Sequence, residues 1–444
     1  MSETSKLRED ALAILGAALA AADAAEAVRL HLHKSDAQLR VGKVNFSLDL
    51  IDRIVVVAVG KASPQMAEAI EQRLGSHFSK GLVITKHGHA NSYKGQCQVI
   101  ESSHPVPDEE SFRAGQAVLG LLKDLTPKDL LIVAVSGGAS SLLCAPVAGI
   151  SLAAKQQTTD ALLRAGADIY ELNAVRKHLS LLKGGNLAAR AYPAQVLSLL
   201  LSDVVGDPLD VIGSGLTAPD QSTFASALDV LSNRSSLETI PAEVRAHLEK
   251  GLGGEVPETP KPGDGIFANV TNAIVGNSRQ ALETASEEAK RRGYLPLILS
   301  SQFQGEAREV AQFHAAILWE TIQSGHPIRL PACLLSGGET TVTVRGNGKG
   351  GRNMEFALAA AIALAGARNI TCLSAGTDGT DGPTDAAGAF LNGETVARAH
   401  ALGLDAADYL NRNDSYTFFS ALGDLLKTGP TGTNVMDVNI MLAG

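Results

Sequence analysis

One stretch of the chain, residues 333–358, combines cations with glycines in a way that suits the binding of an anion. Glycines stand at positions 346, 348, 350 and 351, with Lys349 between them and Arg352 directly after them. Glycine lets the backbone approach a ligand closely. A helix that begins right after the glycines would point free N–H groups and the positive end of its dipole at a negative charge. The stretch therefore predicts a phosphate or carboxylate site.

The elements expected around this loop are two strands and a helix. The apolar residues 333–335 predict a strand that turns at residues 336–338, and the alternating Thr and Val residues 340–345 predict a second strand. The helix is expected from Met354 onward. The glycine spacing also matches a dinucleotide-binding fingerprint, but the next strand, residues 370–374, ends without the acidic residue that holds a ribose. We therefore favour an anion site over NAD(P) binding.

Three apolar runs, residues 51–59, 129–135 and 195–201, predict buried strands of a parallel sheet. They are followed by Gly60, Lys61 and Ser63 after the first, by Ser136, Gly137 and Gly138 after the second, and by Asp203 after the third. Ligands of open α/β sheets bind at the carboxyl ends of strands. We therefore expect Lys61 to hold a phosphate or carboxylate, with a solvated loop lysine as the alternative. Asp203 is a candidate metal ligand or base, or else a turn-capping aspartate.

An acidic loop is the candidate metal site. Asp378, Asp381 and Asp385 fall close together in a glycine-rich segment, which favours a hard divalent cation or a substrate hydroxyl as the ligand. The alternative is a solvated acidic turn.

A helix predicted over residues 173–182 would place Arg176, Ser180 and the following Lys183 on one face. That face is either solvated or a basic wall of the binding site. The other candidates for substrate or nucleotide binding are polar residues of loops and helix starts: His104, Asn277, Ser278, Glu339, Thr431, Gly432 and Thr433. His104 is equally suited to a structural hydrogen bond and to a substrate contact.

The composition excludes several classes of protein. With 444 residues, 45 % of them hydrophobic, the chain is expected to form two or three globular domains. A net charge of −9 and an aromatic content of 4 % argue against a nucleic-acid binder. Four isolated cysteines without metal-site spacing indicate a reducing compartment, and we expect the cytoplasm.

The apolar residues 11–22 lack the positive flank of a signal peptide and are too short to span a membrane, so no membrane partner is expected. They are expected to belong to one long helix over residues 7–33. Residues 222–261 are expected to be helical and then rich in Pro and Gly, and we place a domain boundary there. The predicted domains are residues 1–245 and 246–444.

Eight segments together resemble one known family. In chain order they read VAVGKAS, SSHPVPD, VSGGASSLL, NAVRKHLSLLKGG, LSDVVGDP, SGGETTVTVRGNGKGGRNMEFAL, SAGTDGTDGPTDAAGA and TGPTGTNV. They resemble the glycerate 2-kinase family, the class with a MOFRL domain whose members are often labelled hydroxypyruvate reductase. The resemblance runs from about residue 10 to the end of the sequence.

The resemblance implies two α/β domains with the active cleft between them. We expect an N-terminal Rossmann-like three-layer sandwich with a parallel sheet and a C-terminal mixed-sheet domain whose MOFRL region covers residues 330–440. The implied reaction is ATP- and Mg²⁺-dependent phosphorylation of D-glycerate at the 2-hydroxyl, giving 2-phosphoglycerate. Lys61 and Arg352 match the family's catalytic cations, and Asp203 matches another cleft residue. The alternative is an NAD(P)H-dependent hydroxypyruvate reductase, and a monomer or homodimer is expected.

Overall fold

In the computed structural model, residues 3–234 and 240–444 are described, and they form two compact units. The N-terminal unit comprises Ala24–Ser202 and Asp207–Val275, and the C-terminal unit comprises Asp203–Gly206, Gly276–Gly444 and the residues before Ala24. The first unit contains a mainly parallel sheet and the second a mixed sheet, so the predicted α/β fold class is confirmed. The predicted boundary at residue 246 stays a prediction.

The sheet of the N-terminal unit is built from β4 (Arg53–Val59), β5 (Phe78–Lys86), β6 (Gln98–Ser102), β7 (Asp129–Val135), β8 (Gln195–Leu201) and β9 (Val270–Gly276). Their order is β6-β5-β4-β7-β8-β9, and the pairings from β6 through β8 are parallel. The three apolar runs predicted as strands are confirmed as β4, β7 and β8, and nearly all of their side chains are buried.

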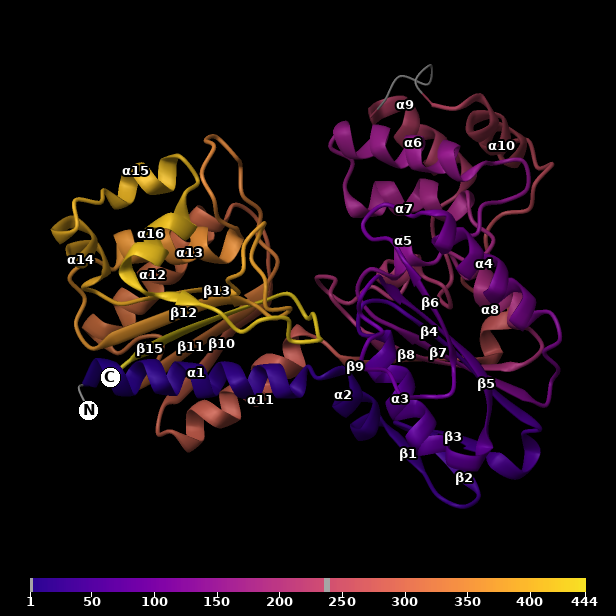
Figure 1. Ribbon diagram of the computed structural model, residues 1–444, viewed down its shortest axis with the longest axis horizontal. Helices are drawn as coiled ribbons and strands as arrows, with labels where there is room; N and C mark the ends of the chain where they lie inside the picture. The colour runs from indigo at the N-terminus through magenta and orange to yellow at the C-terminus, as the bar shows by residue number, and fades with distance from the viewer. Residues whose placement is uncertain (1–2, 235–239) are drawn as a thin grey trace. The chain divides into compact units, whose positions relative to one another are not determined.

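The helices of this unit are α2 (Ala24–His31), α3 (Ser63–Leu74), α4 (Glu109–Leu122), α5 (Ala139–Leu142), α6 (Leu152–Arg164), α7 (Ile169–His178), α8 (Asn186–Ala191), α9 (Phe224–Arg234) and α10 (Ala242–Leu252). α3 packs on β4 and β5 and also contacts α2. α6, α7, α9 and α10 share a separate apolar cluster that includes Leu162, Val175, Phe224 and Leu248, and they lie together in Figure 1.

Short elements complete the N-terminal unit. They are the antiparallel sheet of β1 (Leu32–Lys34), β2 (Gln38–Val41) and β3 (Val44–Ser47), and the 3-10 turns η1 (Leu48–Leu50), η2 (Gly75–His77), η3 (Ile212–Ser214) and η5 (Gly265–Asn269).

The sheet of the C-terminal unit is built from β10 (Leu295–Phe303), β11 (Ala332–Gly338), β12 (Ile370–Gly376), β13 (Gly388–Leu391), β14 (Leu425–Leu426) and β15 (Asp437–Ala443). Their order is β10-β11-β15-β12-β13-β14. β15 therefore lies inside the sheet, antiparallel to both β11 and β12. This strand was not predicted from the sequence.

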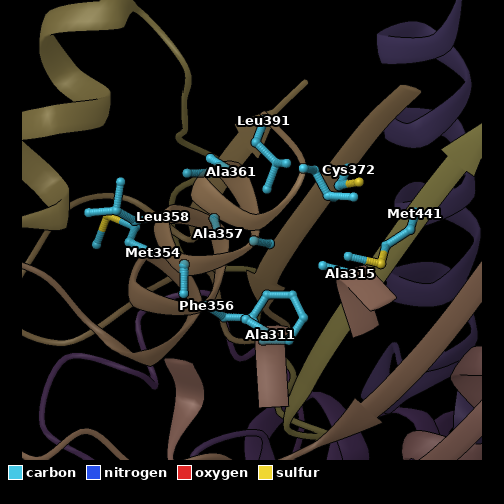
Figure 2. Packing of buried hydrophobic residues seen from close by; sticks show 14 of the residues in the cluster. Ala311, Ala315, Met354, Phe356, Ala357, Leu358, Ala361, Cys372, Leu391 and Met441 are labelled. Carbon is cyan, nitrogen blue, oxygen red and sulfur yellow. The ribbon is translucent and has the colours of Figure 1, made fainter. Parts of the chain in front are cut away.

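The helices of the C-terminal unit are α1 (Glu3–Ala21), α11 (Ser278–Arg291), α12 (Ala307–Ser324), α13 (Arg352–Ala363), α14 (Thr395–Ala401), α15 (Ala406–Asn411) and α16 (Ser415–Leu422). α1 and α11 pack together on one face of the sheet, and α12 and α13 pack together on the other (Figure 1). Figure 2 shows that α13 contributes Met354, Ala357, Leu358 and Ala361 to the hydrophobic core of the C-terminal unit. The helix is buried along most of its length because its many alanines allow close packing.

Several predicted elements are wrong. The single helix over residues 7–33 is two helices, α1 and α2, because the first ends at Ala21 and each packs within a different unit. The Thr/Val strand over residues 340–345 is absent from the described sheet, because the chain leaves the sheet after Gly338 and Thr341 forms only an isolated bridge to Glu306. Its preceding turn at residues 336–338 is instead the end of β11.

Two further helix ends differ from the predictions. α7 ends at His178, where Leu179 caps it, so it does not reach residue 182. The residues after Thr417 predict a helix to about Leu426, but α16 ends at Leu422, and Leu425–Leu426 pair with β13 as β14. Part of the helical pattern over residues 222–261 falls on residues 235–239, which lie outside the described residues.

Within the described part of the chain, no single helix is long and apolar enough to cross a membrane. The bent pair of α1 and α2 passes that test of length and composition together.

Candidate active site

Arg352 is the first residue of α13 and is held by two carboxylates of the C-terminal unit. Its Nε donates to Asp437 Oδ2 at 2.7 Å and its Nη2 donates to Asp437 Oδ1 at 3.0 Å, a bidentate pairing. Its Nη1 donates to Glu339 Oε1 at 2.7 Å. Burial would lower the pKa of Arg352, but the negative charges of Asp437 and Glu339 outweigh it and raise the pKa. The guanidinium is therefore a fixed positive charge.

Asp437, the first residue of β15, has almost no exposed surface. Burial raises the pKa of its carboxyl group, and Arg352 together with the Asn353 amide opposes that shift. Asn353 Nδ2 donates to Asp437 Oδ1 at 2.9 Å, and Asn353 Oδ1 accepts from Ser374 Oγ at 3.0 Å. Asn353, itself held by Ser374, thus fixes the carboxylate that binds Arg352.

The N-terminus of α13, where the sequence predicts a bound anion, already holds one from the chain. Asp381 Oδ1 accepts from Asn353 N at 3.1 Å and its Oδ2 accepts from Met354 N at 2.8 Å. Burial raises the pKa of Asp381 to about 6, although these N–H donors act in the opposite direction. The helix terminus therefore stabilises Asp381, and its first N–H groups are occupied.

The loop glycines pack on the chain itself. A Cβ at Gly346 would lie 2.4 Å from Arg412 O, and one at Gly351 would lie 2.3 Å from Asp381 Oδ1. Asn413 Oδ1 accepts from the backbone N–H of Gly346 at 3.1 Å. The close approach that these glycines allow is therefore to residues 412–415 and to Asp381.

The three aspartates of the acidic loop do different things. Asp378 Oδ1 accepts from Thr380 N at 3.0 Å, Asp381 caps α13, and Asp385 pairs with Lys427 at 2.9 Å and with the Tyr416 hydroxyl. Among the described residues, no group of three or more His, Cys, Asp or Glu side chains is arranged to hold a metal ion. The structure therefore does not bring these three carboxylates together as one set of ligands.

In the N-terminal unit, the turns after β4 and β7 are hydrogen-bonded to each other. Lys61 N donates to Gly137 O at 2.9 Å, and Ala62 N donates to Ser136 Oγ at 3.1 Å. Gly60 has a φ of 131°, and a Cβ there would lie 2.2 Å from Ser136 Oγ. This packing fixes the backbone that carries Lys61. The Ser63 hydroxyl points inward and donates to Ile84 O at 2.8 Å.

His104 lies against the same pair of turns. A Cβ at Gly138 would be 3.0 Å from its Cδ2, so glycine makes room for the ring. Burial lowers the pKa of His104 to about 4, and the positive charges of Lys61 and Lys86 add to that effect. The imidazole is therefore neutral near pH 7 and can accept as well as donate a hydrogen bond.

Lys183 is almost wholly buried, with 1 % of its surface exposed. Its Nζ donates to Ser140 O at 2.8 Å and to Leu143 O at 3.1 Å. Burial, which has the largest effect, and the nearby Lys155 and Arg176 charges together lower its pKa to about 7, against an opposing effect of Cys144. The predicted single helix face is wrong, because Lys183 and Ser180 follow the end of α7 while Arg176 lies within it.

The remaining predicted residues lie in the C-terminal unit. Asn434 Nδ2 donates to Asp203 Oδ2 at 3.4 Å. Asn277 caps α11 by accepting from Gln280 N at 2.9 Å, and the buried Ser278 hydroxyl has no hydrogen-bond partner in the described ranges. Thr431 and Thr433 donate to the backbone oxygens of Thr377 and Ala22, respectively, with the exposed Gly432 between them.

Comparison with known proteins gives these residues a context. Residues 10–249 match a family described as a domain of unknown function, DUF4147, and residues 332–437 match the MOFRL family. A D-glycerate 2-kinase of Thermotoga maritima is 46 % identical over 392 residues, which is 88 % of this chain and 91 % of the relative. The chain belongs to the glycerate 2-kinase family.

Two further relatives of this glycerate 2-kinase family member are informative. A solved structure of a Thermotoga maritima glycerate kinase matches with a TM-score of 0.88 and 42 % identity, covering 99 % of this chain and 100 % of that one. An Agrobacterium vitis protein, 43 % identical over 88 % of this chain and all of its own length, carries a provisional hydroxypyruvate reductase name. The resemblance drawn from the motifs is confirmed, while the roles of individual residues stay predictions.

The sequence reasoning missed three residues that hold this family member's Arg352 in place. Asp437 binds the guanidinium, Asn353 bridges the Asp437 carboxylate to Ser374, and Asn413 fixes the glycine loop. The sequence does hold a signal for Asp437, because an aspartate at the end of an apolar run is a candidate site residue. Asp437 begins the mostly apolar residues 437–443, just as Asp203 follows residues 195–201. For Asn413 no comparable pattern exists.

We expect the stability of the C-terminal unit to depend on Asp381 in a specific direction. Its pKa is raised from 3.8 to about 6 in the folded chain. Its contribution to stability is therefore fully present below about pH 4 and is lost as pH rises through 6. Urea unfolding between pH 4 and 7 should show a fall in the wild-type midpoint that is weaker in Asp381→Asn. Parallel pH profiles for the two proteins would contradict this.

Proposed function

We propose that this protein is an ATP-dependent kinase that phosphorylates D-glycerate at the 2-hydroxyl, giving 2-phosphoglycerate and ADP. The observation that carries the proposal is the 46 % identity to the Thermotoga maritima D-glycerate 2-kinase over most of both chains. The cations Lys61 and Arg352, each on a well-ordered backbone, agree with the proposal. Phosphoryl transfer depends mainly on positioning the reacting groups and on neutralising the charge of the phosphoryl group.

In this proposal the two catalytic cations are Lys61 and Arg352. Asp437 binds Nε and Nη2 of Arg352, while among the described residues Nη1 pairs only with the exposed Glu339 carboxylate. A phosphoryl or carboxylate oxygen can take the place of Glu339 at Nη1 without breaking the buried pair. Lys61 adds a second positive charge on a backbone fixed by Ser136 and Gly137.

Asp203 is the proposed base, accepting the proton of the substrate 2-hydroxyl at a carboxylate oxygen as that hydroxyl attacks the γ-phosphoryl group. The neutral imidazole of His104 and the backbone around Ser136, Gly137 and Gly138 are proposed to orient the substrate. The other proposed binding residues are Gly60, Ser63, Arg176, Lys183, Asn277, Ser278, Thr431, Gly432 and Thr433.

Mg²⁺ is proposed to accompany ATP. It usually takes one or two carboxylates and otherwise binds water and the nucleotide's phosphates, so it does not need a complete protein cage. Of the three predicted ligands, Asp378 fits best, because Asp381 is committed to α13 and Asp385 to Lys427. When bound, the ion would neutralise the phosphate oxygens.

The proposal also covers domain organisation, location and assembly. We propose two domains, residues 1–245 and 246–444, and a cytoplasmic location. We further propose a monomer or homodimer without nucleic-acid or membrane partners. The four cysteines are free and buried, which agrees with a reducing compartment.

A coupled assay tests the activity. With D-glycerate, ATP and Mg²⁺ the purified protein is expected to form ADP, and removal of Mg²⁺ with EDTA is expected to abolish the reaction reversibly. Phosphorus NMR should identify the 2-phosphate as the product. Hydroxypyruvate-dependent oxidation of NADH or NADPH without any ADP formation would overturn the proposal in favour of the reductase.

A further inference from the structure

α6 places a lysine where the helix faces the protein interior. The buried residues of this helix are Ala154, Lys155, Thr158 and Leu162, so Lys155 belongs to its inward face. Ala154 and Leu162 join the apolar cluster that α6 shares with α7, α9 and α10. Lys155 is only 4 % exposed, which is rare for a lysine without a partner.

The Lys155 ammonium lacks a hydrogen-bond partner within residues 3–234 and 240–444. Burying a charge or a polar group without compensation is strongly unfavourable, so an unpaired buried lysine requires an explanation. Burial lowers the pKa of Lys155, and the Arg176 charge lowers it further against an opposing effect of Cys144. Its surroundings are therefore apolar and positively charged.

A second unsatisfied donor lies in the same region. Asn173 is buried on α7, and its Nδ2 lacks a partner in the described part of the chain. Its Oδ1 is fixed, because it accepts from Ser214 Oγ at 2.9 Å, and Ser214 Oγ in turn lies 2.8 Å from Ser140 Oγ. Lys183 Nζ donates to the backbone oxygen of the same Ser140 at 2.8 Å.

Arg176 completes the group, three residues after Asn173 on α7 and so on the same side of that helix. Its pKa is lowered by burial alone, with no carboxylate raising it. Across the described residues, neither Lys155, Arg176 nor Lys183 forms an ion pair with Asp or Glu. Three cations and an amide donor therefore gather without an acceptor of opposite charge.

We propose that Lys155, Asn173, Lys183 and the half-buried Arg176 form an oxyanion subsite of the N-terminal unit that takes a carboxylate or phosphate group. Lysine and arginine are the residues that bind such groups most strongly, and an oxyanion supplies the acceptors that Lys155 Nζ and Asn173 Nδ2 lack. The assignment to a particular substrate rests on the proposed kinase function, in which D-glycerate carries the carboxylate and ATP the phosphates. Lys155 and Asn173 become residues of that site.

The decisive variant is Lys155→Met, which keeps an unbranched side chain of similar length and removes its charge. Replacing an unpaired buried charge by an apolar side chain is expected to leave the fold intact or to stabilise it. If the subsite holds the substrate carboxylate, KM for D-glycerate should rise about 10- to 100-fold with KM for ATP unchanged. If it holds a phosphate, KM for ATP should rise instead. Unchanged values of both would overturn the proposal.

A binding measurement separates this proposal from the kinase activity. Thermal unfolding of the wild-type protein is followed with added D-glycerate and, separately, with inorganic phosphate, without ATP. At least one should raise the unfolding temperature of the wild type and fail to do so in Lys155→Met. If the wild type shows this shift but forms no ADP, the subsite stands and the kinase proposal falls. If ADP forms but the shift is equal in both proteins, the subsite falls.

Two controls guard against trivial effects. Lys250→Met removes an exposed lysine from α10 of the same unit and should behave as the wild type in every assay. Asn173→Asp keeps an oxygen for Ser214 and puts a carboxylate among the three cations. It should abolish the anion-dependent shift while keeping the unfolding temperature without anion at or above that of the wild type. An undiminished shift in Asn173→Asp would contradict the proposal.

Discussion

Arg352→Met is expected to lower kcat for D-glycerate phosphorylation about 10³-fold, since arginines that stabilise the transferring phosphoryl group contribute at least this much. The guanidinium is held by Asp437 through two hydrogen bonds and by Glu339 through one. Only the contact with the exposed Glu339 is easily exchanged for a substrate oxygen. Lysine cannot reproduce the bidentate geometry, so Arg352→Lys should recover little of the lost activity.

The same substitution also removes the partner of a buried carboxylate. Leaving Asp437 unpaired is expected to destabilise the unit by about 3–5 kcal/mol. The double variant Arg352→Met with Asp437→Asn removes that unpaired charge. It should regain most of the unfolding temperature but not the activity. Recovery of kcat in the double variant would mean that Arg352 acts only through stability, and near wild-type kcat in the single variant would exclude it from catalysis.

Lys61→Met is expected to lower kcat about 10²- to 10³-fold, as the loss of one fixed charge-stabilising group does. Its effect on stability should be small. The Lys61 ammonium makes no hydrogen bond or ion pair within the part of the chain that the structure describes, while its backbone N–H bonds to Gly137 and is unaffected. Turnover and thermal unfolding measured side by side test this. A large drop in unfolding temperature would indicate a structural role.

His104 supplies an independent readout of the Lys61 charge. Its pKa is lowered to about 4 by burial and, secondly, by Lys61. Removing the charge should therefore raise the pKa of His104, as followed by NMR titration of the ring. Lys80→Met, an exposed substitution in β5, should leave that pKa unchanged. Equal titration midpoints in Lys61→Met and the wild type would show that the ammonium does not act on this ring.

The parallel sheet could be predicted from the sequence because its information is local. Residues 51–59, 129–135 and 195–201 are mostly apolar, and such runs are typical of a strand buried on both faces. The order of the strands in the sheet determines where the turns after them lie. For this reason the turns that carry Lys61 and Ser136 are predictable as neighbours, and they are hydrogen-bonded to each other.

The environment of Arg352 could not be predicted in the same way. Its partner Asp437 is 85 residues away in sequence, and the aspartate that caps its helix, Asp381, is 28 residues from Asn353. The glycines of the loop at residues 346–351 suit a ligand-binding loop. Glycine is needed both for close approach to a ligand and for close approach to residues 412–415, so its presence in the sequence does not separate the two. The sequence does not single out Lys155, because a lysine within a helix is normally solvated and only its burial distinguishes it.

The position of β15 has a consequence for the order of assembly. This strand follows every other strand of its sheet in the chain, yet it lies between β11 and β12. Until it is synthesised and inserted, β11 and β12 each have an unpaired edge of the kind that invites aggregation. Its first residue is Asp437, so Arg352 acquires its main partner in the same step that closes the sheet. A nascent chain can therefore not possess the anchored arginine before the C-terminal unit has completed its fold.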